Sequence, residues 1–163
     1  MRIGLMSDTH GNWEAIDYII SKVKRVDLWL HMGDCTPDAE YLKSLVDIPV
    51  YGVCGNCDWA SDTFPEERIL DIEGHRIFLT HGHNYSVRYS PDLLFDAARL
   101  QNADIVIYGH THVAEFLLDD GIYAINPGSA SRPRDEDRPS FMLVDLEKDN
   151  PPEPHLIRMK LYE

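Results

Sequence analysis

Short apolar runs alternate with amphipathic stretches along the whole chain. The apolar runs predict β-strands at residues 2–7, 27–31, 49–53, 68–72, 76–80, 105–108, 115–118, 122–125, 141–146 and 156–161. Apolar positions with helical spacing predict three helices between them, which begin after Asn12, at Thr36-Pro37 and at Ser90-Pro91. Asn12 is a capping residue, and the other two starts combine a capping hydroxyl with proline.

The order of these elements indicates the fold class. Crossover helices come early in the chain, whereas hairpins come later, for example around Glu73-Gly74-His75. A Pro-rich loop is expected at residues 150–154, between the last two strands. The first helix is expected to have Trp13, Ile16 and Ile19 on its apolar face. The third helix is expected to have Leu93 and Leu100 on its apolar face. The pattern predicts a single α/β domain over residues 1–163, with two mixed sheets packed face to face and helices outside.

Composition narrows the class of protein further. The formal net charge is −13, which argues against binding long nucleic acids, because such proteins cluster Lys and Arg. No apolar run is long enough to cross a bilayer and no signal peptide is recognisable, so we expect a cytoplasmic protein without a membrane partner. Three cysteines, Cys35, Cys54 and Cys57, make a disulfide framework improbable.

Five apolar runs stop in glycine or in a residue type that binds metals. The segments after them are Asp8-Thr-His10, Gly33-Asp34, Gly55-Asn56-Cys57-Asp58, His81-Gly-His83 and Gly109-His110-Thr-His112. Asp8 and His10 are two residues apart, so in extended backbone their side chains reach one common point. Because the carboxyl ends of parallel strands line one crevice, all these groups are expected at one sheet edge.

These segments contain five of the eight histidines, whereas His31, His75 and His155 are interpreted as ordinary hydrogen-bonded residues. So many imidazoles and carboxylates need a partner when buried, and divalent cations supply one. The mixture of imidazole, carboxylate and amide favours catalytic Mn, Fe, Co, Ni or Zn over a Cys-rich structural zinc site. There are more candidate ligands than one ion can bind. Their number therefore predicts two ions that share a carboxylate.

Taken in order, the five segments resemble the calcineurin-like metallophosphoesterase superfamily. The short chain and Asn126-Pro127-Gly128-Ser129 resemble its small bacterial and archaeal phosphodiesterase branch. The resemblance covers residues 2 to about 146 and implies a four-layer αββα sandwich.

The resemblance also implies two divalent ions, manganese first, with Ni, Fe, Co and Zn as alternatives. It implies Asp8, His10, Asp34 and His112 as ligands of one ion, and Asp34, Asn56, His81 and His110 as ligands of the other. Asn56 and His110 would also take part in catalysis. A water bridging the two ions would attack a small phosphodiester in line with the leaving group.

Cys57 departs from the family pattern, because many members have histidine at this position as the acid for the leaving oxygen. A thiol at this position is a catalytic candidate, and we expect a preference for activated or aryl esters. Arg132 and Arg134 are candidate phosphate-binding residues. The alternative role for these two arginines is a solvated ion pair with Asp135, Glu136 or Asp137.

Two other functions stay open at this level. The same centre could hydrolyse phosphomonoesters. The family fold also resembles a retromer coat subunit, in which it serves protein assembly, so a non-catalytic scaffold is the alternative from another class. The filled ligand positions favour an enzyme, and the sequence leaves the oligomeric state open, a homo-oligomer included.

Overall fold

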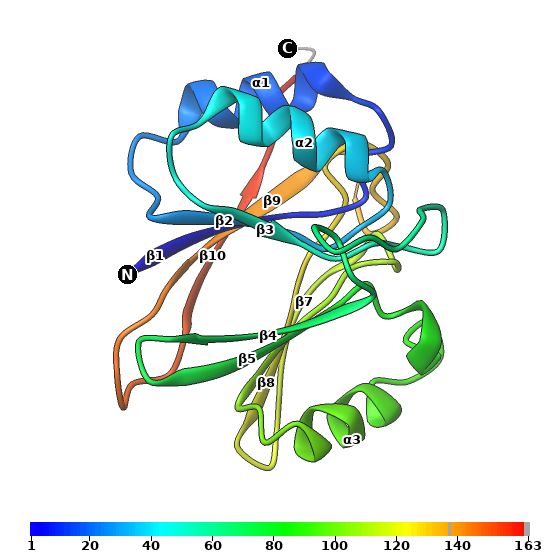
Figure 1. The fold of residues 1–163 in the computed structure, drawn as a ribbon, viewed down its shortest axis with the longest axis vertical. Coiled ribbons are helices and arrows are strands. Elements are labelled where there is room, and N and C mark those ends of the chain that lie inside the picture. The colour runs from blue at the N-terminus through cyan, green and yellow to red at the C-terminus, as the bar shows by residue number, and fades with distance from the viewer. Residues whose placement is uncertain (137, 162–163) are drawn as a thin grey trace.

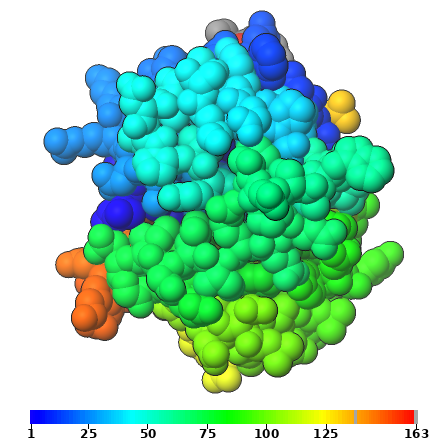
Figure 2. Space-filling view, in the orientation of Figure 1, coloured from blue at the N-terminus to red at the C-terminus, as the bar shows by residue number. Residues whose placement is uncertain are grey.

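Two five-stranded sheets pack face to face, and helices cover their outer faces (Figure 1). This computed structural model describes residues 1–136 and 138–161. The four-layer αββα arrangement expected from the sequence is confirmed. In the space-filling view, the blue and cyan N-terminal residues form the upper half of the visible face, and green and yellow residues form the lower half (Figure 2).

The first sheet has the strand order β10-β9-β1-β2-β3. Its strands are β1 (Arg2–Met6), β2 (Leu28–His31), β3 (Val50–Gly52), β9 (Ser140–Asp145) and β10 (Glu153–Arg158). β1, β2 and β3 are parallel, and β9 runs antiparallel to both β1 and β10. Parallel neighbours need crossovers, which α1 (Trp13–Lys22) and α2 (Thr36–Leu45) provide.

The second sheet has the strand order β4-β5-β6-β8-β7. Its strands are β4 (Glu67–Ile72), β5 (His75–Thr80), β6 (Ile105–Ile107), β7 (Ala114–Asp119) and β8 (Ile122–Pro127). β5, β6 and β8 are parallel, whereas β4 and β7 form hairpins with their neighbours. The short helix η1 (His83–Tyr85) and α3 (Asp92–Leu100) connect β5 to β6.

Three apolar clusters separate the four layers. The central cluster lies between the sheets and includes Leu5, Leu79 and Ile107. A second cluster joins the first sheet to α1 and α2, and a third joins the second sheet to α3. Burying both faces of each sheet explains why the central strands are almost wholly apolar. No helix in residues 1–136 or 138–161 combines the length and apolar character needed to cross a membrane.

The capping predictions were right for α1 and wrong for α2. Asn12 Oδ1 accepts a hydrogen bond from the Ala15 N–H, 3.1 Å away. The hydroxyl of Thr36 does not cap α2; Cys35 is the N-cap residue and makes no side-chain cap. Instead Asp58, from the loop after β3, accepts from the N–H groups of Cys35 and Thr36, both at 2.9 Å. A side chain from a distant loop has taken the role of the local cap.

Two other expectations need correction. The last strand is β10 at Glu153–Arg158 rather than residues 156–161, so Pro154 belongs to a strand. β10 is an edge strand, where proline is tolerated because its missing N–H can face away from the sheet. The apolar residues Leu93 and Leu100 of α3 and Trp13 of α1 are exposed, Trp13 by 51%.

Trp13 packs on the surface and supports the loop before α1. Its ring stacks on Tyr41 of α2, with centroids 4.2 Å apart. Its indole N–H donates to Asp38 Oδ1 at 2.9 Å, and the other oxygen of Asp38 accepts from the Gly11 N–H at 2.7 Å. These contacts link α2 to the segment that carries His10.

The segments with the predicted ligands meet beyond the carboxyl ends of strands from both sheets rather than along the edge of one sheet. The carboxyl ends of β1, β2, β3 and β5 lie on the right-hand side of Figure 1, and β6 runs parallel to β5. The one-edge arrangement expected from the sequence is therefore wrong, since both sheets contribute. Sandwich packing brings two sets of strand ends to one place.

Candidate metal centre

Every predicted ligand lies within a few residues of a strand end. Asp8 and His10 follow β1, Asp34 follows β2, Asn56 follows β3, His81 directly follows β5, and His110 and His112 follow β6. The structure brings all of these residues together, although the segments are far apart in sequence. Their roles as ligands stay predictions.

The first group of donors forms a tight cluster. Asp8, His10, Asp34 and His112 each offer one ligand atom, and these atoms lie within 4.8 Å of one another. His112 Nε2 lies 3.3 Å from Asp8 Oδ1 and 3.3 Å from His10 Nε2. His10 Nε2 lies 4.0 Å from Asp34 Oδ2.

The second group surrounds the other side of Asp34. His81 Nε2 lies 3.4 Å from Asp34 Oδ2 and 3.8 Å from Asp8 Oδ1. The His81 and His110 rings are 5.1 Å apart, and His110 Nδ1 lies 3.1 Å from Asn56 Oδ1. Asp34 is thus adjacent to donors of both groups.

Two buried atoms at the centre have no hydrogen-bond partner among the described residues. They are Asp8 Oδ1 and His81 Nε2, whose side chains are both inaccessible to solvent. Leaving such atoms unpaired costs about 1–3 kcal/mol each, and more for a charged group. A cation between them would supply the missing partner, so the residues present fit a bound metal.

Backbone carbonyls orient two of the imidazoles. His81 Nδ1 lies 2.6 Å from the carbonyl oxygen of Met32, and His112 Nδ1 lies 2.6 Å from that of Arg132. A carbonyl only accepts, so each Nδ1 carries the proton and donates it. In neutral imidazole this leaves the Nε2 lone pair directed at the cluster, as in metal-binding histidines.

The backbone around the cluster is strained. Asp8, His10, Asp34, His110 and His112 have φ values of 53°, 47°, 57°, 70° and 60°. L-residues avoid this left-handed region at a cost of about 1–2 kcal/mol each. Such strain persists where surrounding contacts hold it and is concentrated at functional sites.

Two glycines make room for the carboxylates. A Cβ on Gly55 would lie 2.1 Å from Asp34 Oδ1, and a Cβ on Gly109 would lie 2.7 Å from Asp8 Oδ2. Both distances are well inside van der Waals contact. The glycines are therefore required because the carboxylates press against the backbone there.

The electrostatic environment suits cation binding. Burial raises the pKa of Asp8 and Asp34, but the nearby imidazoles of His112 and His81 outweigh it, so both pKa values are lowered. Burial lowers the pKa of His10, and burial with the charges of His81 and Arg88 lowers the pKa of His110 to about 4. At neutral pH the carboxylates are ionised and these two imidazoles are neutral, the forms that bind metals.

His81 differs from its neighbours. Burial lowers its pKa, yet the carboxylate of Asp34, 3.4 Å from Nε2, and the charge of Asp8 raise it overall. Without a cation, a proton on Nε2 offsets part of the charge of the two carboxylates. Metal and proton therefore compete for this nitrogen.

A pocket of about 340 Å³ opens over the cluster. Cys57, Arg132 and Arg134 line it, and their roles in catalysis and in phosphate binding stay predictions. The backbone N–H of Cys57 donates to Asp34 Oδ1 at 3.2 Å, and burial with the charges of Asp34 and Asp58 raises the pKa of its thiol.

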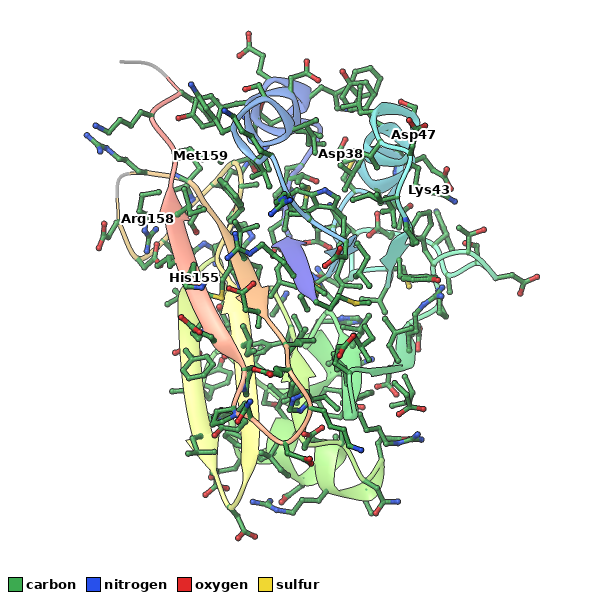
Figure 3. All side chains as sticks on the ribbon, turned by 90° about the vertical axis from the view of Figure 1, so that its left-hand side faces the viewer. Asp38, Lys43, Asp47, His155, Arg158 and Met159 are labelled. Carbon is green, nitrogen blue, oxygen red and sulfur yellow. The ribbon has the colours of Figure 1, made fainter. Side chains whose placement is uncertain are left out.

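Two of the three acidic residues named as alternative partners of the arginines lie next to Arg158. Asp135 lies 2.7 Å from Arg158 Nη2, and Glu136 lies 3.8 Å from Arg158 Nε. Arg158 projects from β10 (Figure 3). Asp137, the third proposed partner, lies outside the described residues. Asp135 and Glu136 thus face Arg158.

Several supporting residues escaped the sequence analysis. Asp58 accepts three backbone N–H bonds, from Cys35, Thr36 and Gly55, and so joins the segments that carry Asp34 and Asn56. The hydroxyls of Ser129 and Ser131 donate to the carbonyl of Asp8 at 2.8 and 2.9 Å. Asp58 belongs to one of the five predicted segments and Ser129 to the Asn-Pro-Gly-Ser segment, but neither segment indicated these contacts.

Arg88 is the other omission. It lines the pocket from the loop between η1 and α3, and a single arginine between a histidine-rich segment and a helix carries no recognisable signal.

The remaining histidines lie outside the cluster. His83 has its ring 5.5 Å from that of His81, and its buried Nδ1 has no described partner. His31 contacts Thr9 at 3.0 Å, and His75 pairs with Asp104 at 2.6 Å. His155 lies 3.1 Å from Asp145. The interpretation of His31, His75 and His155 as ordinary hydrogen-bonded residues agrees with these contacts.

Comparison with known proteins identifies the family. The model for the calcineurin-like phosphoesterase superfamily domain matches residues 1–149. The chain belongs to this superfamily. It is 33% identical over 150 residues to the probable metallophosphoesterase YsnB of Bacillus subtilis, covering 91% of this chain and 86% of YsnB. The resemblance inferred from the five segments is therefore confirmed.

Solved structures give the same picture of the superfamily fold. A structure of a novel archaeal phosphodiesterase matches with a TM-score of 0.78 and 26% identity, over 98% of this chain and 100% of that chain. Vps29 of Entamoeba histolytica, solved as a Zn²⁺ complex, matches with a TM-score of 0.75 and 23% identity, over 97% of this chain and 99% of that chain. The likeness to Vps29 shows the fold alone.

Proposed function

We propose that the protein is a phosphodiesterase that uses two divalent metal ions to hydrolyse small phosphodiesters. The observation that carries the proposal is the pair of buried atoms, Asp8 Oδ1 and His81 Nε2, left without described partners among converging donors. Superfamily membership supports an esterase. The likeness to an archaeal phosphodiesterase supports the diester class.

The proposed ligands divide between two positions. Asp8, His10, Asp34 and His112 would hold one ion, and Asp34, Asn56, His81 and His110 the other. Two divalent ions bound there would acidify a shared water and offset the charge that develops on the phosphoryl oxygens. Manganese is our first candidate, with Ni, Fe, Co and Zn as alternatives.

The chain itself supplies positioning and contacts to the substrate. The carbonyls of Met32 and Arg132 hold the His81 and His112 rings in place. Arg132 and Arg134 line the pocket and offer guanidinium groups to phosphoryl oxygens. Cys57 lies in the same pocket with a weakly acidic thiol, so leaving groups that depart without protonation, such as aryl oxides, are favoured.

The test is hydrolysis of bis(p-nitrophenyl) phosphate by purified protein before and after chelation. We expect activity to disappear with the chelator and to return with Mn²⁺. Asp34→Asn should lower kcat/KM by about a thousandfold or more, because the carboxylate charge adjacent to both groups of proposed ligands is lost. Asp145→Asn, which removes a carboxylate from the opposite side of the molecule, is the matched control and should keep activity. A Cys57→His variant should gain most on alkyl esters, whose leaving groups need an acid.

The same assay separates the alternatives. Faster turnover of p-nitrophenyl phosphate than of the diester would make the protein a phosphomonoesterase. Absence of turnover with every metal would favour a non-catalytic scaffold, an alternative kept open by the shared fold of Vps29. Chelator-resistant hydrolysis would contradict the metal-dependent mechanism.

A further inference from the structure

Three arginines surround the mouth of the candidate pocket. Arg88, Arg132 and Arg134 all line the space above the donors, although they come from loops more than forty residues apart. All three side chains are exposed, so their guanidinium groups meet solvent and any bound ligand. The chain has 15 basic and 28 acidic residues, so a local excess of positive charge runs against its average.

None of the three guanidinium groups forms an ion pair with a described residue. The acidic side chains near them have other partners. Asp58 accepts three backbone N–H bonds, and Asp135 binds Arg158 at 2.7 Å and the N–H of Ala114 at 2.7 Å. The positive charges at the mouth are therefore available to a ligand.

The backbone holds these arginines at fixed places relative to the metal centre. The carbonyl of Arg132 accepts from His112 Nδ1 at 2.6 Å, and the N–H of Arg134 donates to the carbonyl of His112 at 2.9 Å. Arg88 follows Val87, which packs into the apolar cluster beneath α3. The next residue, Tyr89, closes a turn through its N–H and the carbonyl of Ser86 at 3.0 Å. Anchored backbones lower the entropic cost of presenting such side chains.

Charge balance decides what these arginines bind. Two divalent ions outweigh the carboxylates of Asp8 and Asp34, so a singly charged diester would be neutralised at the metals without help from three guanidinium groups. Arginine binds phosphate through paired N–H donors, which a second phosphate would satisfy. The negative charge over the rest of the surface would disfavour long polyanions.

We propose that Arg88 forms, with Arg132 and Arg134, a second anion subsite, and that the preferred substrate is a small phosphodiester carrying a further phosphate group. This inference rests on the proposed phosphodiesterase function. It adds Arg88 as a residue that determines specificity, and it assigns the substrate class.

The test uses two substrates that differ by one phosphate. They are the p-nitrophenyl ester of thymidine 5′-phosphate and the same ester with a 3′-phosphate. We expect the wild-type protein with Mn²⁺ to prefer the second, in kcat/KM, by about tenfold or more, the usual effect of a charge-assisted hydrogen bond. Arg88→Gln should remove most of this preference, and Arg88→Lys, which keeps the charge but not the paired donors, should remove part of it. Arg25→Gln, on an exposed residue at the other end of the molecule, is the control and should keep it.

A binding measurement makes the result independent of turnover. Calorimetry on chelator-treated protein should show tighter binding of thymidine 3′,5′-bisphosphate than of thymidine 5′-phosphate, and Arg88→Gln should reduce that difference. Hydrolysis of both esters at equal kcat/KM, or a preference unchanged in Arg88→Gln, would overturn the subsite and leave the phosphodiesterase intact. Failure to hydrolyse either ester would instead overturn the proposed function, and the binding data would then decide whether the anion subsite stands.

Discussion

Residues 1–136 and 138–161 contain two clusters of histidine and carboxylate side chains that could hold a metal ion, and they lie at opposite ends of the first sheet. One is the candidate metal centre beyond the carboxyl ends of β1 and β2. The other consists of Asp145 on β9 with Glu153 and His155 on β10, and its ligand atoms also lie within 4.8 Å of one another. Figure 3 labels His155. Distance alone does not distinguish them.

The two clusters differ in how deeply their side chains are buried and in whether those side chains already have partners. Asp145 is occupied by Arg2, whose Nε and Nη2 donate to its two oxygens at 2.7 and 2.8 Å. The side chain of His155 is 41% exposed, and none of the three residues has positive φ. In the candidate metal centre Asp8, Asp34 and His112 are buried, two atoms lack described partners, and the backbone is strained. A metal site thus requires ligands whose orientation is fixed by hydrogen bonds to other groups and whose metal-facing atoms have no other partner.

The largest expected difference between the clusters is the effect of a mutation in each on the thermal stabilisation of the protein by a metal ion. Saturating Mn²⁺ at about a hundred times Kd should stabilise the wild type by about 2.7 kcal/mol, or roughly 5–10 °C in Tm. Asp8→Asn should lose this shift, whereas Asp145→Asn should keep it. Differential scanning fluorimetry of chelated and reloaded protein measures it, and an equal loss in both variants would end the distinction between the clusters.

A smaller effect is expected from the support behind the metal centre. Asp58→Asn leaves at least one of the three N–H groups of Cys35, Thr36 and Gly55 facing an amide N–H, at a cost of about 1–3 kcal/mol. We expect about a tenfold to hundredfold rise in the Mn²⁺ concentration that gives half-maximal activity. Asp62→Asn, an exposed change in the same loop, is the control. A variant with normal metal dependence would show that Asp58 does not position the ligands.

The smallest effect concerns the pH dependence of the Arg2–Asp145 pair. The hydrogen bond from Arg2, helped by His155, lowers the pKa of Asp145 to about 2. Because the folded pKa lies below the unfolded value of about 3.9, the pair stabilises the fold above about pH 4 and loses its effect as the pH falls toward 2. Asp145 is about one-third exposed, so the contribution should be under about 1 kcal/mol.

Urea unfolding of the wild type and Asp145→Asn measures this effect. The gap between their midpoints should be wider at pH 6 than at pH 3, and chelator should not alter it. A gap of the same size at both values would show that the ion pair is not what stabilises this cluster.

The sequence predicted the site best where residues of metal-binding type directly follow a strand. The segments with Asp8, Asp34 and His81 were found because a ligand residue type interrupts an apolar run, which is a local signal. The layers of sheets and helices were predicted from the alternation of apolar runs with amphipathic stretches. Residue types and their order therefore predicted both the sandwich and the set of residues that converge.

Contacts between distant segments were beyond the sequence analysis. The cap of α2 comes from Asp58, more than twenty residues away, so the local hydroxyl of Thr36 gave the wrong answer. Arg88 lines the pocket next to Val87, which is partly buried and packs against the apolar cluster beneath α3. The start of β10 at Glu153 depends on its pairing with Asp145, which no local pattern near Pro154 indicates.

The tight fit at Gly55 and Gly109 bears on how relatives of this chain should be judged. A homologue could retain every histidine and aspartate of the cluster and still lose the centre if either glycine gained a side chain, because the carboxylate would be pushed from its place. Inventories of ligand residues alone would then overcount active members of the superfamily. The absence of a methyl group at two positions is as much a part of the site as the side chains that converge on it.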